Sequence, residues 1–230
     1  MIEDVRGGTR ERLLEAAVEL TAELPGSEIS LRAVCDRVGV RMPTLYHYFG
    51  NKDGLLDAVA EYGFNLYLSA KANRESSGDP IQDLRDGWDA HVAFGLANPG
   101  LYTLMYGQVR PGDARPATSR PTQMLRALTG VAEEQGRLTV SADQAAAHIL
   151  ATNVGVTLRQ ILLAAPDPAL TAAVRDAVIA GITGIGNDES SRRSALFAAL
   201  DFAVARPDLL GEKETALLAS WLQRLAEAAD

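Results

Sequence analysis

Helical spacing of apolar residues runs through almost the whole chain, and this feature most narrows the folds that are possible. Apolar side chains recur at intervals of three and four, and no stretch alternates cleanly as a half-buried strand does. One such face consists of Leu31, Val34, Cys35 and Val38, at positions i, i+3, i+4 and i+7. With 230 residues, 47% of them hydrophobic, the chain can bury a sizeable core. We therefore expect an all-α protein.

Composition argues against several classes of protein. No stretch approaches the roughly 18 consecutive apolar residues of a membrane span, and the first residues lack the basic-then-apolar order of a signal peptide. We therefore expect a cytoplasmic protein with no membrane partner. The single cysteine, Cys35, excludes an intrachain disulfide, and one cysteine with three scattered histidines argues against a zinc site. We expect no metal and no cofactor.

Turn and break residues divide the chain into segments. The polar stretch "NRESSGDP" at residues 73–80 predicts a boundary between an N-terminal domain, 1–72, and a larger C-terminal domain, 73–230. Thr9 is the expected N-cap of the first helix, and residues 107–121, with three prolines and two glycines, predict a loop. Beyond the boundary, the spacing predicts helices over 81–97, 101–106, 117–135, 141–165, 168–183, 190–205 and 212–228.

Residues 30–49 have the pattern of a helix-turn-helix. Ser30 can cap a short helix that Gly39 ends, and Pro43 suits the first turn of a second short helix. Leu45 and Phe49, four residues apart, would anchor that second helix to the core. Asn51 would cap the next helix, on which an apolar face that includes Tyr62 is expected to point inward.

The second short helix would carry an unusual number of polar side chains on its outer face. Helical spacing turns the following residues at least partly outward: Arg41, Met42, Thr44, Tyr46, His47 and Tyr48. Hydroxyl groups bind phosphate oxygens, and methyl or aromatic edges contact thymine methyl groups. Lys52, at the start of the next helix, suits a phosphate. The alternative is structural, with the two tyrosines covering a core and the histidine an ordinary surface residue.

Charge is distributed in a way that suits this interpretation. The chain carries a formal net charge of −8, which argues against non-specific nucleic-acid binding. Residues 30–52 nevertheless hold four basic residues against one acidic residue, a local net charge of +3. The basic residues are Arg32, Arg37, Arg41 and Lys52.

The stretch "SLRAVCDRVGVRMPTLYHYFGNKDGLLDAV", residues 30–59, resembles the DNA-binding signature of TetR-type (tetracycline-repressor-like) transcriptional regulators. The resemblance extends over about residues 9–71. It implies an all-helical homodimer with an N-terminal three-helix DNA-binding domain and a C-terminal domain for ligand binding and dimerisation. It also assigns DNA contacts to Ser30, Arg32, Thr44, Tyr46, Tyr48 and Lys52. Many members have histidine at the position of Tyr48, whereas here His47 lies one residue earlier.

The C-terminal domain offers a candidate ligand pocket. Aromatic walls with a few polar groups suit a small organic effector, although such residues at helical spacing also build ordinary cores. The candidates are Trp88, His91, Phe94, Tyr102, Met105, Tyr106 and Asn153. Residues 143–165 are apolar on more than one face, which is typical of a helix buried on both sides, inside the domain or against a second subunit. His148, on the same helix, suits either a cavity or a dimer seam.

These observations predict a ligand-responsive repressor that binds a palindromic DNA operator as a homodimer and is released by a small-molecule effector. Enzyme signatures are missing: the sequence has no G-x-S-x-G, H-E-x-x-H or phosphate-loop motif. Two alternatives stay open, a helical enzyme and an adaptor that binds a protein through its aromatic surface.

Overall fold

The structure is a computed structural model, and it describes residues 3–23, 28–72, 76–107, 116–184 and 189–227. Within these ranges every regular element is helical and no strand occurs, which confirms the expected all-α class. The elements are α1 (Glu3–Glu23), α2 (Leu31–Val38), α3 (Met42–Phe49), α4 (Lys52–Ala72), α5 (Pro80–Ala97), α6 (Pro99–Tyr106), α7 (Pro116–Glu134), α8 (Ala142–Leu163), α9 (Pro168–Thr183), α10 (Glu189–Ala205), the 3₁₀ turn η1 (Pro207–Leu209) and α11 (Glu212–Glu227).

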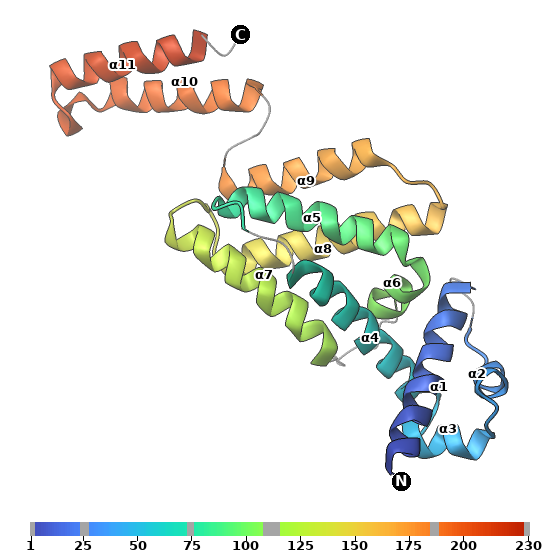
Figure 1. Ribbon diagram of the computed structural model, residues 1–230. Coiled ribbons are helices and arrows are strands. Elements are labelled where there is room, and N and C mark those ends of the chain that lie inside the picture. The colour runs from blue at the N-terminus through green and yellow to red at the C-terminus, as the bar shows by residue number, and fades with distance from the viewer. Residues whose placement is uncertain (1–2, 24–27, 73–75, 108–115, 185–188, 228–230) are drawn as a thin grey trace.

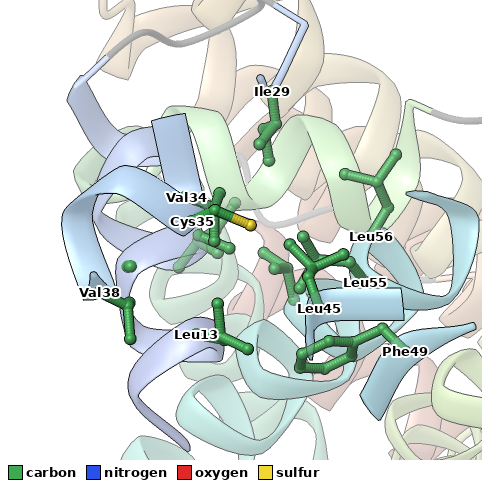
Figure 2. Packing of buried hydrophobic residues seen from close by; sticks show 13 residues of the cluster. Leu13, Ile29, Val34, Cys35, Val38, Leu45, Phe49, Leu55 and Leu56 are labelled. Carbon is green, nitrogen blue, oxygen red and sulfur yellow. The ribbon is translucent and has the colours of Figure 1, made fainter. Parts of the chain in front are cut away.

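The first three helices pack around the beginning of α4 and form one end of the molecule (Figure 1). Their shared core contains Leu13 of α1, Val34 of α2, Leu45 of α3 and Leu55 of α4, all fully buried (Figure 2). A hydrogen bond from Arg12 Nη2 to the Val38 carbonyl oxygen, 2.9 Å long, also ties α1 to the end of α2. Helices α1, α2 and α4 thereby hold α3 in a fixed orientation.

The larger part of the molecule is a bundle of α5, α7, α8 and α9, into which the far end of α4 extends (Figure 1). Trp88, Ile149, Ile179 and Ile182 are at most 4% exposed and belong to its core. No helix in the described parts of the chain is long and apolar enough to cross a membrane.

Helix α6 connects the two cores. Leu101 is 4% exposed and belongs to the core of the first four helices. The next residue, Tyr102, is fully buried and meets the ring of His91 in α5. One turn of helix therefore touches both parts of the protein.

Helices α10 and α11 form a hairpin that extends from the end of α9 (Figure 1). They pack chiefly on each other. Several large apolar side chains of the hairpin are exposed, and these are Phe197, Phe202, Val204, Leu209, Leu210, Leu217, Trp221 and Leu225.

Three local predictions were wrong. Thr9 is not an N-cap, because α1 begins six residues earlier, at Glu3. Tyr62 is 38% exposed, and the neighbouring Phe64 fills the core instead. Residues 116–121 of the predicted loop belong to α7, with Pro121 inside the helix, while residues 108–115 lie outside the described ranges. The predicted domain boundary falls partly on residues 73–75, which also lie outside them.

Candidate nucleic-acid interface

Local interactions shape the two short helices as the sequence predicts. The Ser30 side chain accepts a hydrogen bond of 3.3 Å from the Ala33 N–H and caps α2. Gly39 ends α2 with φ of 75°, a left-handed conformation that glycine adopts without steric cost. Pro43 occupies the first turn of α3, where its missing N–H is not needed.

The inner face of α3 holds the helix in place. Leu45 is fully buried and Phe49 is 9% exposed, and both pack in the core that Figure 2 shows. The guanidinium of Arg10 lies 5.2 Å from the centre of the Phe49 ring, within the range of a cation–π contact. These contacts confirm that the two side chains anchor the helix.

The outer face of α3 and the turn before it carry the predicted DNA-binding side chains in two groups. Arg41, Tyr46 and His47 are exposed, with Tyr46 at 44%. Met42, Thr44 and Tyr48 are half-buried. Of these six predicted residues, three are therefore exposed on this surface and three are only partly accessible.

Tyr48 and His47 differ in their surroundings. Tyr48 packs against the core of the first four helices, while His47 is exposed and meets the Tyr48 ring edge-on at 5.2 Å between centres. Met42 also leans inward, with its Sδ 3.6 Å from the Sγ of the buried Cys35. Of the two adjacent rings, His47 is therefore the more accessible.

Some basic residues of the interface are held in ion pairs, and others have no ion-pair partner among the described residues. Arg37 is bound by the Glu23 carboxylate at 2.9 and 3.0 Å and by Glu19 at 3.4 Å, and the hydrogen bond from Arg37 lowers the pKa of Glu23. Arg37 thus fastens α2 to α1. Arg32 and Arg41 are exposed and have no ion-pair partner among the described residues. Their charges are available to phosphates.

Lys52 is paired with Glu28, a residue that lies just before α2. The hydrogen bond from Lys52, together with its charge, lowers the pKa of Glu28. The Glu28 side chain is 85% exposed, so the pair lies in solvent, where ion pairs are weak. A phosphate can replace this carboxylate at small cost. Glu28 could not be identified as the partner of Lys52 from the sequence, because the two residues come together only on folding.

The turn that presents Lys52 is defined by two residues. Gly50 has φ of 73°, which favours glycine. The Asn51 side chain accepts a hydrogen bond of 2.8 Å from the Gly54 N–H, and this confirms Asn51 as the cap of α4.

Six of the predicted ligand-pocket residues lie on α5 and α6, next to aromatic side chains of α4, and Asn153 lies on α8. Tyr102 and Tyr106 lie 4.8 Å apart between ring centres, and His91 lies within 5.6 Å of both. His91 Nε2 and the Tyr102 hydroxyl oxygen share a hydrogen bond of 2.6 Å. Burial raises the pKa of both tyrosines far above the ordinary range, so both hydroxyls stay protonated.

A cavity of about 30 Å³ borders this ring cluster. Three of the seven predicted pocket residues line it: Trp88, His91 and Asn153. Phe94, Tyr102, Met105 and Tyr106 are not among its lining residues. Its other walls come from α4, α5, α7 and α8, and include Tyr67, Leu84, Gly87, Pro121, Leu125, Leu128, Ile149 and Leu150. His148 is exposed on the outside of α8.

Asn153 is 3% exposed, and both ends of its side-chain amide make hydrogen bonds. Its Nδ2 donates to the Trp88 carbonyl oxygen at 3.2 Å, and its Oδ1 accepts from the Thr157 hydroxyl at 3.2 Å. No group of three or more His, Cys, Asp or Glu side chains in the described ranges is placed to hold a metal ion.

Comparisons with known proteins agree with this geometry. Residues 13–59 match the family model described as "Bacterial regulatory proteins, tetR family". Tetracycline repressor protein class C of Escherichia coli is 40% identical over 52 residues, which are 23% of this chain and 24% of that protein. The HTH-type transcriptional repressor NicS of Pseudomonas putida is 30% identical over 145 residues, which are 60% of this chain and 64% of that protein.

Solved structures share the fold over a longer stretch. A protein with unknown function from Rhodococcus sp. RHA1 superposes with a TM-score of 0.63 at 27% identity, covering 76% of this chain and 95% of that one. This chain spans less than two thirds of the length of the curated relatives that it matches.

Proposed function

We propose that this chain, whose residues 13–59 match the tetR family model, is a cytoplasmic transcriptional repressor that binds a palindromic operator as a homodimer and is released by a small organic effector. The observation that carries this proposal is the two-sided α3 helix. Leu45 and Phe49 fix it from inside, while Arg41, Tyr46 and His47 are exposed outside. A recognition helix needs this combination of rigid support and polar surface.

The proposed contacts fall into two kinds. Thr44, Tyr46, His47 and Met42 lie on α3, from which side chains reach base edges in the major groove. Tyr48 also lies on α3, and Arg41 directly precedes the helix. Ser30, Arg32 and Lys52 lie at helix beginnings and would bind phosphates. The Ser30 oxygen accepts a hydrogen bond within α2, but its hydroxyl hydrogen can still be donated to a phosphate.

A two-fold dimer would place two α3 helices about 34–36 Å apart, one turn of DNA, or at a multiple of that distance. Exposed apolar side chains in the C-terminal part support association with a second copy. Leu162 and Leu163, at the end of α8, are 83% and 54% exposed, and Trp221 of α11 is 53% exposed. Contiguous apolar patches, more than single apolar side chains, mark surfaces that are covered in an assembly, and Leu162 and Leu163 are adjacent.

Helix α6 provides a route by which an effector can act on DNA binding. Leu101 packs in the core that supports α3, and the adjacent Tyr102 bonds to His91, which lines the cavity. Tyr67, which also lines the cavity, lies on α4, the helix that begins at Lys52. An effector that binds better when these walls are displaced would shift the position of α3.

Selection of DNA from a random pool tests the proposal. We expect the purified protein to enrich a sequence with two-fold symmetry, and the Tyr46→Ala variant to enrich none. Enrichment of no sequence by the folded wild-type protein would contradict the proposal and favour a protein-binding adaptor.

A further inference from the structure

The cavity beside α5 contains a buried donor that the protein itself does not satisfy. Trp88 is 1% exposed and lines the cavity, yet its indole Nε1 has no hydrogen-bond acceptor among the described residues. An indole N–H can only donate, and a buried donor without an acceptor destabilises the protein. Such a group calls for an acceptor that enters from outside the protein.

The other cavity walls limit the chemistry of that acceptor. The lining residues are mostly aliphatic or aromatic, and no Asp, Glu, Lys or Arg is among them. The polar Asn153 already bonds to Trp88 and Thr157. A charged ligand would lose its hydration without an opposite charge on the walls, which is strongly unfavourable.

One buried cation, Arg85, lies on the same helix as Trp88 and could in principle attract an anionic ligand. Arg85 precedes Trp88 by three residues on α5, and its side chain is 9% exposed. Its Nη1 is paired with Asp176, which balances its charge, although Nη2 has no partner among the described residues. Arg85 does not line the cavity, so an anion inside would not contact it.

The cavity is too small for an organic ligand unless its walls move. A volume of about 30 Å³ has room for water, whereas sites for drug-sized molecules occupy roughly 300–1,000 Å³. A ligand must therefore push the walls apart. Leu125 and Leu128 of α7 are half-buried, so this wall can move outward at less cost than the α5 wall, where Leu84 and Trp88 are at most 2% exposed.

We propose that this cavity is the effector site and that the effector is an uncharged, mainly apolar molecule whose carbonyl or similar acceptor binds the Trp88 N–H. This inference rests on the proposed ligand response. The ligand is uncharged and mainly apolar, Trp88 recognises it, and α7 moves outward to admit it.

Three small molecules of nearly equal shape test whether the ligand is uncharged and carries a hydrogen-bond acceptor. Acetophenone carries a carbonyl acceptor, α-methylstyrene replaces that oxygen with CH₂, and benzoate carries a negative charge. We expect acetophenone to shift the ¹⁵N-indole NMR signal of Trp88 in the full-length protein and to leave the exposed Trp221 unchanged. Its affinity should exceed that of α-methylstyrene by about 2- to 10-fold, the value of one hydrogen bond, and that of benzoate by more than about 10-fold.

Variants locate the interaction. Trp88→Phe keeps the ring but removes the donor, so calorimetry should show that acetophenone no longer binds better than α-methylstyrene. Trp221→Phe is the matched control and should keep the preference. If Trp88→Phe fails to fold, Leu128→Ala gives a second test, because a wider cavity should bind acetophenone more tightly.

Several outcomes would overturn the inference. A Trp88 signal that acetophenone does not move at its solubility limit would leave water as the partner of the indole. Tighter binding of benzoate would point to an anionic effector and to Arg85. Neither result depends on DNA, so selection of a palindrome by the same protein would keep the proposed function while the ligand class fails. If acetophenone shifts the Trp88 signal but the protein selects no palindrome, the ligand class stands and the proposed DNA-binding function fails.

Discussion

A Cβ atom at Gly100, in the first turn of α6, would lie 2.1 Å from the backbone carbonyl oxygen of Thr21 in α1. Real Cβ atoms do not approach a carbonyl so closely, so only glycine permits this contact. The contact joins the helix that reaches the ring cluster to a helix of the DNA-binding part. Its closeness fixes the position of one part relative to the other.

Gly100→Ala should therefore separate α6 from α1. We expect thermal unfolding to show a loss of about 1–3 kcal/mol, the usual cost of overpacking. Binding to a selected operator should weaken as well, because α3 would lose its fixed position. Gly130→Ala in α7 is the control, because a Cβ there meets nothing within 4 Å and a helical alanine should be neutral or stabilising. Equal stability of the two variants would contradict this account.

Tyr46→Ala should separate recognition from folding. Tyr46 is 44% exposed, so its loss should leave the unfolding temperature nearly unchanged while operator binding falls. Leu45→Ala, one residue away, removes a fully buried side chain and should cost about 2–5 kcal/mol of stability. Fluorescence anisotropy with labelled operator and a thermal melt measure both effects. If Tyr46→Ala unfolds the domain, the aromatic residue belongs to the core.

Predictions from the sequence were most accurate where local interactions decide the structure. The helix predicted over residues 168–183 has those bounds in α9. Its start is capped by Asp167, which accepts from the Leu170 N–H at 2.9 Å. Gly184 ends it with φ of 69°. Capping groups and glycine act within a few residues, so their effect is visible in the sequence.

Long-range pairing could not be predicted in this way. Arg37 and Lys52 both belong to the basic stretch 30–52, but their glutamate partners Glu23 and Glu28 lie 14 and 24 residues away in the chain. The cavity likewise combines Trp88 with Tyr67 of α4 and with side chains of α7. Helical spacing shows which face of each helix is apolar, but not which helices meet.

Lys52→Ala should weaken operator binding and lower the slope of log affinity against log salt by about 1, because one phosphate contact is lost. Glu28→Gln should have the opposite effect on affinity, because it releases Lys52 from its carboxylate partner. Lys213→Ala, an exposed lysine in the distant α11, serves as the control. A salt titration in which Lys52→Ala keeps the wild-type slope would remove Lys52 from the DNA contacts.

Cys35 should report on opening of the DNA-binding part. Burial, together with the charge of Asp36, raises the pKa of its thiol, so little thiolate exists at neutral pH. The native protein should react with a thiol reagent much more slowly than the unfolded chain does. Leu45→Ala should accelerate the reaction, because the same core covers Cys35. Native labelling at the rate of a free thiol would contradict the packing of α2.

Asp176 should make the stability of the helical bundle sensitive to acid. Burial raises the pKa of Asp176, but the bonds from Arg175 and Arg85 outweigh it, and the net shift is downward. A carboxyl group with a lowered folded-state pKa stabilises the protein above its unfolded-state pKa. This contribution is lost as the pH falls through the folded-state value. Denaturant midpoints of the wild-type protein should therefore decrease on acidification.

Asp176→Asn tests this origin directly. The substitution leaves Arg85 buried without its carboxylate and should cost roughly 1–3 kcal/mol at neutral pH, with a weaker dependence on pH below that. Asp89→Asn is the matched control, since Arg175 loses one partner there but keeps Asp176 at 3.0 Å. If Asp176→Asn destabilises the protein by the same amount at every pH, ionisation of Asp176 is not what makes the bundle acid-sensitive.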